Sequence, residues 1–268
     1  KSLEFSIMIT NNKELFINQL FDSWKNSQQM EPISNIDHDI SINDAYQIQL
    51  GVIEKRRALG QRVVGKKIGI TSKPVMELLG VNQPDYGNLM SDMGYSSGDS
   101  LNIKNFCQPK AEGEIAFILK KDLYGPDVTH KMVLDATEFI SPAIEIVDSR
   151  IKNWEIKIQD TVADNASSGA YILGTQKVSP SSVDMVACRM QFMKNRNVVG
   201  RGTGAATLGN PLNAVTWLAN KMSHIDSGLE AGDVILSGSL SVMLPVEPGD
   251  EISIKIEDMG EGVSCSFY

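Results

Sequence analysis

The sequence predicts an α+β protein in which a helical N-terminal portion is attached to a large mixed β-structure. Through the first 60 residues, apolar side chains recur at the spacing of amphipathic helices. From about residue 101 onward, short β-rich segments separated by glycine-containing turns dominate. These strands do not alternate regularly with long helices, which disfavours a doubly wound parallel sheet or a (β/α)8 barrel.

Two helices are expected in the N-terminal portion. The first begins where Asn11 or Asn12 can act as N-cap. The second begins at Ser41, with Asp44 three residues later as a variant of the capping box, and stops near Gly60. The positions that share one face of the first helix are Leu15, Phe16, Gln19, Leu20 and Trp24.

The remaining elements are shorter. The β-branched, glycine-punctuated run RVVGKKIGIT (62–71) precedes a short helix over residues 74–79. The other expected helices cover residues 132–137 and 212–222, and the candidate strands are 112–119, 143–148, 171–173, 190–194, 233–237 and 251–256. We expect residues 1–70 to form the helical portion packed on the core, and residues 71–268 to form the mixed-β catalytic domain.

Composition excludes several classes of function. A formal net charge of -8, without a basic patch, argues against a nucleic-acid partner. Three widely spaced cysteines, Cys107, Cys188 and Cys265, form neither a disulfide framework nor a CxxC metal site, so a reducing cytoplasm is expected. No stretch approaches the roughly 20 apolar residues of a membrane helix, so no membrane association is expected.

The segment PKAEGEIAF contains the first candidate for chemistry. Side chains alternate along a strand, so Glu112 and Glu114 point to the same face, where like charges repel unless a cation lies between them. Glu145 lies in a second apolar strand, where a lone acid is hard to explain as a solvated residue. These residues alone leave two interpretations open, a solvent-exposed sheet face or a site for a hard cation such as Mg²⁺ or Mn²⁺.

Other polar segments are ambiguous. Lys66 favours a surface position, whereas Lys67 is equally compatible with the surface and with a desolvated acid–base role. Asp85 lies in a turn, a position that is usually structural. Residues 160–169 (DTVADNASSG) favour a turn cluster over a ligand-orienting loop. Residues 200–205 match G-x-G-x-x-A but are expected to form a hairpin or loop, because Pro211 follows too soon for a nucleotide-binding helix.

Taken together, the segments VVGKKIGITSK, QPDYG, QPKAEGEIAFIL, EIVDSRI, IQDTVADNASSG and LSGSL resemble the hydratase/decarboxylase branch of the fumarylacetoacetate hydrolase superfamily. They occur in the same order between residues 63 and 240. The resemblance implies a mixed β roll or sandwich of the fumarylacetoacetate hydrolase C-terminal-domain type, decorated by helices. It also implies an Mg²⁺ or Mn²⁺ cofactor and a homo-oligomer.

The resemblance assigns roles residue by residue. The implied metal ligands are Glu112, Glu114 and Glu145. The implied catalytic residues are Lys67 and Asp85, and the implied substrate-binding residues are Ser167, Ser168 and Ser237. A 2-oxo acid or its enol would chelate the metal through its carboxylate and the adjacent oxygen, so that the metal stabilises an enolate.

The implied activity is addition of water to the small molecule 2-hydroxypenta-2,4-dienoate, giving 4-hydroxy-2-oxopentanoate in aromatic meta-cleavage catabolism. Decarboxylation of 2-oxo-3-hexenedioate (4-oxalocrotonate) is the alternative. Gly113 and the uninterrupted KKIGIT favour hydration, whereas an unassigned Arg or Lys in the pocket would favour decarboxylation. An inactive scaffold in complex with the decarboxylase is the alternative of another class, and loss of a metal-binding Glu or of Lys67 would indicate it.

Overall fold

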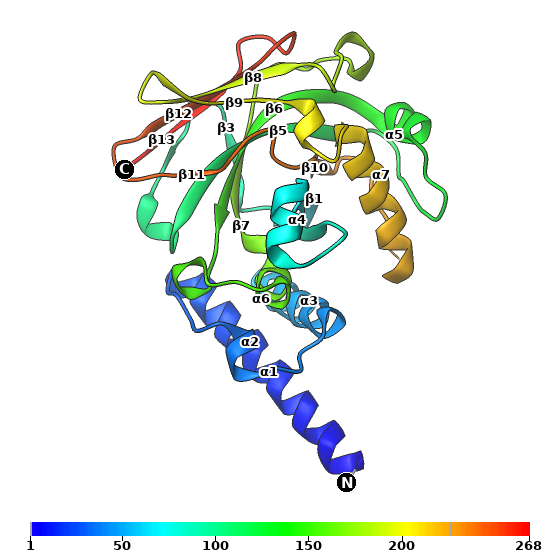
Figure 1. The fold of residues 1–268 in the computed structure, drawn as a ribbon, viewed down its shortest axis with the longest axis vertical. Helices are drawn as coiled ribbons and strands as arrows, with labels where there is room; N and C mark the ends of the chain where they lie inside the picture. The colour runs from blue at the N-terminus through cyan, green and yellow to red at the C-terminus, as the bar shows by residue number, and fades with distance from the viewer. Residues whose placement is uncertain (1, 226) are drawn as a thin grey trace.

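Two stacked β-sheets and a group of N-terminal helices make up the molecule (Figure 1). The structure, a computed structural model, describes the backbone of residues 2–225 and 227–268, and the side chains of residues 12–225 and 227–268. The predicted α+β class, with mixed β-structure and an N-terminal helical portion, is confirmed. Among the described helices, none combines the length and hydropathy needed to cross a membrane.

The larger sheet has eight strands in the order β2-β1-β10-β5-β6-β7-β3, with β11 paired to β5. Only the pairs β1/β10 and β3/β7 are parallel in this sheet. Its strands are β1 (Val63–Gly69), β2 (Asp85–Met90), β3 (Gly94–Ser96), β5 (Pro109–Leu119), β6 (Thr137–Asp148), β7 (Ser168–Leu173), β10 (Val234–Leu236) and β11 (Leu244–Pro245).

The smaller sheet has five strands in the order β4-β13-β12-β8-β9. They are β4 (Ser100–Leu101), β8 (Arg189–Lys194), β9 (Asn197–Thr203), β12 (Glu251–Ile256) and β13 (Val263–Phe267). The main core lies between the two sheets. There Gly113 allows a close approach, because a Cβ on it would lie 2.4 Å from Met190 Sδ and 2.5 Å from Ile254 Cδ1.

The N-terminal helices form a second core at one end of the molecule (Figure 1). They are α1 (Ser2–Asn26), α2 (Ile33–Ile36) and α3 (Ile42–Ala58), and α6 (Ile158–Ala163) packs with them. Phe16 and Leu20 of α1 and Ile48 of α3 are buried there beside Val162 of α6. The other helices are α4 (Lys73–Leu79), α5 (His130–Ala136) and α7 (Pro211–Met222).

Most predicted elements are present, with two differences. Ser41 caps α3 through the expected capping box with Asp44, but α1 begins at Ser2 rather than at Asn11 or Asn12, because asparagine only weakly disfavours a helix interior. Asp85 was assigned to a turn, yet it begins the buried strand β2. The domain boundary at residue 70 stays a prediction, and β1, which precedes it, pairs with β2 and β10 in the larger sheet.

A short 3-10 turn, η3 (Asn165–Ser167), holds three consecutive residues with positive φ, of 56°, 50° and 53°. Non-glycine residues adopt this conformation only where surrounding contacts impose it. The Asn165 side chain supplies such contacts by accepting from Asn88 N at 2.7 Å and donating to Asn88 O at 2.9 Å. The turn is thereby attached to the free edge of β2.

Arg150 ties the other side of this turn to the end of β6. The buried guanidinium donates through Nε to Asp164 Oδ1 at 2.5 Å and through its terminal nitrogens to Ser168 O at 2.9 Å and Asp164 O at 2.6 Å. Because all partners are buried, the ion pair holds the chain in place on both sides of η3.

We expect Arg150→Met to lower the free energy of unfolding by about 3–5 kcal/mol, because Asp164 would remain buried without its cation. Chemical denaturation measures this loss. The matched control is Arg189→Met, which removes an exposed Arg–Glu257 pair and should leave the unfolding midpoint nearly unchanged. Equal effects of the two substitutions would contradict the structural role of Arg150.

Candidate metal and proton-transfer site

Three glutamates from two adjacent strands meet on one face of the larger sheet. Glu112 of β5 lies directly opposite Glu145 of β6, and Glu114 follows two residues later on the same face. One carboxylate oxygen from each residue lies within 4.8 Å of the others. The strand alternation therefore brings together the three carboxylates that the sequence singled out.

Several of these oxygens are buried without a hydrogen-bond donor. Glu114 Oε2 accepts from Gly238 N at 2.8 Å, but Glu114 Oε1 and Glu145 Oε2 accept no hydrogen bond from the described residues, and Glu145 Oε1 has only its ion pair with Lys67. Two effects raise the pKa of Glu112 and Glu114: burial, which is the larger, and the negative charge of Glu145. They raise the pKa of Glu112 to about 7 and the pKa of Glu114 well above its ordinary value. Glu112 is half-buried, and together the three carboxylates fit a hard divalent cation, which favours oxygen ligands and would supply the missing charge.

Lys67 extends from β1 toward this cluster. Its buried Nζ lies 3.1 Å from Glu145 Oε1 in an ion pair and donates a hydrogen bond to Ala166 O at 2.9 Å. Burial favours a lower pKa, but Glu145, Asp85, Glu112 and Glu114 outweigh it and raise the Lys67 pKa. The lowered pKa that desolvation alone would give Lys67 is therefore reversed by the protein's own carboxylates.

Lys66 points to the other face of the same strand. It is buried, with 9% of its surface exposed, and donates to Asn88 Oδ1 at 2.9 Å. The surface position that the sequence favoured for Lys66 is wrong, because β1 lies inside the sheet between β2 and β10.

Asp85 lies beside Lys67 because of the register between β1 and β2. Asp85 is opposite Gly69, and a Cβ on Gly69 would lie 2.3 Å from Asp85 Oδ1 and 3.4 Å from Lys67 Nζ. Both Asp85 oxygens are buried without a hydrogen-bond partner among the described residues. Burial raises the pKa of Asp85 to about 6, against the opposing effect of Lys67.

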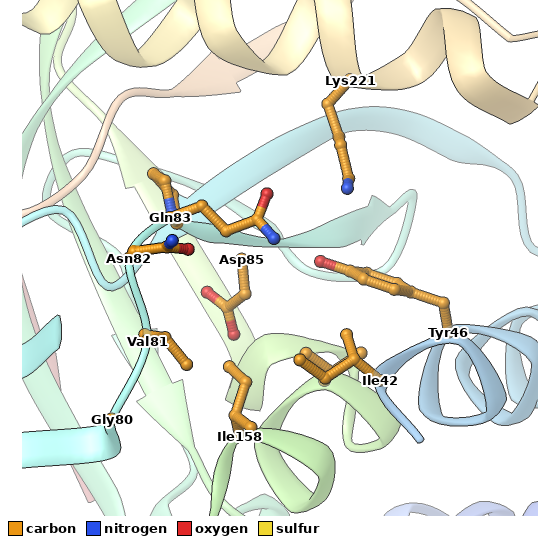
Figure 2. A pocket seen from close by; sticks show the side chains of 11 residues that line it. Ile42, Tyr46, Gly80, Val81, Asn82, Gln83, Asp85, Ile158 and Lys221 are labelled. Atoms are coloured by element: carbon orange, nitrogen blue, oxygen red, sulfur yellow. The ribbon is translucent and has the colours of Figure 1, made fainter.

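A cavity of about 360 Å³ opens next to Asp85 (Figure 2). Tyr46 forms one wall and stacks on Tyr86, with 4.6 Å between ring centroids. The lining residues are Ile42, Tyr46, Gly80, Val81, Asn82, Gln83, Pro84, Asp85, Ile158, Val162 and Lys221. The sequence contained no signal for Tyr46 or Lys221, since each lies in an ordinary amphipathic helix and meets Asp85 only through the fold.

The three serines differ in their surroundings. Ser168 Oγ donates to Asn165 O at 2.7 Å, and Ser167 Oγ lies 3.5 Å from Thr161 Oγ1. Ser237 Oγ is buried and has no hydrogen-bond partner among the described residues. Contact of these serines with substrate stays a prediction.

A pair of mixed sheets presents a largely buried three-carboxylate cluster, which could hold a metal ion, beside a lysine and an aspartate, an arrangement typical of an enzyme site. The chain belongs to the fumarylacetoacetate hydrolase family, because the family's sequence model, described as fumarylacetoacetate (FAA) hydrolase C-terminal, matches residues 72–265. The resemblance seen in the sequence motifs is thus confirmed.

Three relatives are informative. A 2-hydroxyhexa-2,4-dienoate hydratase of Comamonas testosteroni is 48% identical over 251 residues, covering 93% of this chain and 94% of the relative. A 2-hydroxypent-2,4-dienoate hydratase of Pseudomonas putida is 53% identical over 207 residues, covering 77% of this chain and 93% of the relative. The solved 4-oxalocrotonate decarboxylase of Pseudomonas putida G7, complexed with magnesium and adipate, has a TM-score of 0.93 at 31% identity and covers 97% of this chain and 98% of that one.

We expect Mg²⁺ to stabilise the protein strongly at pH 8 and weakly at pH 6. The pKa of Glu112 is raised to about 7, and that of Glu114 is also raised. Both groups therefore bind protons below neutral pH, and a cation must displace those protons in order to bind. Without metal, protonation of Glu112 and Glu114 stabilises the folded state. This stabilisation is fully present below the pKa that these groups have in the unfolded chain, and it is lost as pH rises through about 7.

Thermal unfolding with Mg²⁺ or with EDTA measures this difference. At pH 8 and a Mg²⁺ concentration of about 100 times Kd, the expected increase in Tm is about 5–10 °C. Glu114→Gln should abolish the increase, whereas Glu138→Gln, an exposed position on β6, should retain it. An increase of the same size at both pH values would contradict the carboxylate site.

Proposed function

We propose that this protein is a metal-dependent hydratase, a carbon–oxygen hydro-lyase, that adds water to 2-hydroxypenta-2,4-dienoate and gives 4-hydroxy-2-oxopentanoate. The observation that carries the proposal is the Glu112–Glu114–Glu145 cluster, buried at Glu114 and Glu145, next to Lys67 and Asp85. It occurs in a chain 48% and 53% identical to proteins named as dienoate hydratases. The reaction belongs to aromatic meta-cleavage catabolism.

The three glutamates would hold Mg²⁺ or Mn²⁺, and the bound cation supplies Lewis-acid stabilisation of a 2-oxo acid's enolate. The calcium-and-acetate and magnesium-and-adipate complexes of the decarboxylase support a hard divalent cation at this fold. Glu112, Glu114 and Glu145 orient the acid end of the substrate by setting where that charge lies.

Asp85 is the better candidate for moving protons. Its pKa of about 6 lies close to neutrality, so it can both accept and release a proton. It also lines the cavity, where it can reach the substrate's carbon chain and the added water. Lys67 balances negative charge through its ion pair with Glu145 and is held in place by its hydrogen bond to Ala166 O.

The decarboxylase alternative has one observation in its favour. Lys221 lines the cavity, and a cation there can pair with the second carboxylate of 2-oxo-3-hexenedioate. The identity to hydratases, 48% over 251 residues against 31% to the decarboxylase, favours hydration. The inactive-scaffold alternative is disfavoured, since all three glutamates and Lys67 are present.

The cellular setting belongs to the same proposal. A homo-oligomer in the cytoplasm, in complex with the decarboxylase of the same pathway, suits an enzyme that handles a short-lived dienol. The net charge of -8 gives no attraction to nucleic acid.

Assays with the two substrates side by side test the proposal. The metal-loaded protein should remove the ultraviolet absorbance of 2-hydroxypenta-2,4-dienoate, and Glu114→Gln should abolish this activity while Glu138→Gln preserves it. CO₂ release from 2-oxo-3-hexenedioate, with no change in the dienoate, would replace the hydratase proposal by the decarboxylase alternative.

Gly69→Ala tests the placement of Asp85. The new Cβ would lie 2.3 Å from Asp85 Oδ1, so the carboxylate must move, and a misplaced acid–base group costs about 100-fold in kcat/KM. The control is Gly200→Ala in β9, where the nearest heavy atom lies 3.4 Å away, in ordinary contact. Steady-state kinetics with the dienoate measure both variants, and equal rates would show that Asp85 is not the proton carrier.

A further inference from the structure

The loop of residues 237–241 runs along β5 on its way from β10 to β11. Two backbone hydrogen bonds attach it to that strand, one to Ile115 O at 3.2 Å and one to Gly113 O at 2.9 Å. Between these attachments, Gly238 N donates to Glu114 Oε2 at 2.8 Å. The loop therefore supplies the one hydrogen bond that the Glu114 carboxylate accepts from the described residues.

Gly238 can present this N–H group because it is a glycine. Its φ is 111°, in a region that other residues rarely adopt, and a Cβ on it would lie 2.4 Å from Thr71 Cγ2. A glycine also has more backbone freedom to lose than any other residue. The loop therefore needs contacts that hold it in the one geometry that directs the N–H group to Glu114.

Thr207 provides such a contact from the opposite side of the loop. Its side chain is fully buried, and its Oγ1 lies 3.1 Å from Gly238 O and 3.1 Å from Ser239 O. A hydroxyl has a single proton, so the two carbonyls share it. Among the described residues, no other group donates a hydrogen bond to either carbonyl.

The glycine-rich run that precedes Thr207 brings it close to the loop. Residues 200–205, which match a nucleotide-binding pattern, pack instead against the protein's own backbone, because a Cβ on Gly202 would lie 1.8 Å from Leu240 O. Thr207 N then donates to Gly204 O at 3.1 Å, which fixes the threonine relative to this run. The glycines thus serve the approach of two chain segments and not the binding of a nucleotide.

We propose that Thr207 is a positioning residue of the metal site. Its hydroxyl holds the loop carbonyls, the loop directs the Gly238 N–H group at Glu114, and this hydrogen bond sets the orientation in which the carboxylate meets a divalent cation. Among the described residues, Thr207 makes no hydrogen bond to Glu114 itself, so it acts through the loop. The inference rests on the proposed function, since it takes Glu114 as a metal ligand.

The affinity for Mg²⁺ tests this role. Thr207→Val keeps the shape of the side chain and removes the donor, and calorimetric titration of the full chain at pH 8 should give a Kd for Mg²⁺ that is about 10–100 times larger than that of the wild-type protein. Thr207→Ser retains the hydroxyl and should keep the wild-type Kd. Thr207→Cys offers a weaker S–H donor and should give an intermediate Kd.

Thr137→Val is the matched control. Thr137 is also buried and donates through Oγ1 to a backbone carbonyl, Val133 O, at 2.7 Å, but it lies at the start of β6, whereas Glu145 lies near the end of that strand. Both valine substitutions remove a buried hydrogen bond and should lower the unfolding midpoint in EDTA. Only Thr207→Val should also weaken Mg²⁺ binding.

A wild-type protein that binds Mg²⁺, with the same Kd after Thr207→Val, overturns the inference and leaves the proposed function intact. An equal loss of affinity in Thr137→Val also overturns it, because general destabilisation would then account for both results. If Thr207→Val does not fold, equal Kd values for Thr207→Cys and Thr207→Ser overturn the inference. A wild-type protein that binds no Mg²⁺ overturns the proposed metal-dependent function itself.

Discussion

Four carboxylates around one lysine, three of them buried and Glu112 half-buried, are the constraint on which the rest of this structure depends. Glu112, Glu114, Glu145 and Asp85 all act on the Lys67 ammonium, which cannot neutralise them alone. A buried carboxylate without compensation is strongly unfavourable, so this part of the sheet is incomplete without another positive charge. On the proposed function, a divalent cation would supply this missing positive charge.

The surrounding framework keeps this charge cluster in register. Gly113 lets the smaller sheet pack directly behind the glutamate strand, and Gly69 leaves room for the Asp85 carboxylate. On the far side, Arg150 and Asn165 hold a turn of three left-handed residues, which presents Ala166 O to Lys67. The residues between and around the charged groups thus position them without taking part in the chemistry.

Hydration and decarboxylation can share this arrangement, because both require a 2-oxo acid whose enolate is stabilised. The two substrates differ at their distal ends, and the cavity beside Asp85 combines apolar walls with Lys221. That a solved decarboxylase has a TM-score of 0.93 with this chain at only 31% identity agrees with this division.

The sequence by itself determined the local features of this protein. Strand alternation placed Glu112 and Glu114 on one face, the Ser41–Asp44 box predicted the start of α3, and ordered motifs identified the family. The neighbouring Pro84 makes Asp85 resemble a turn residue when only nearby positions are considered. Its place in a strand depends on pairing with Gly69, which lies on another strand.

Only the tertiary structure decided that Glu145 lies opposite Glu112, that nearby carboxylates raise the pKa of Lys67, and that a cavity lies between Tyr46 and Lys221. These depend on strand register, burial and the approach of helices far apart in the chain. A periodic pattern specifies which face a side chain occupies, but not which residue meets it there, because that choice is made by packing over the whole chain.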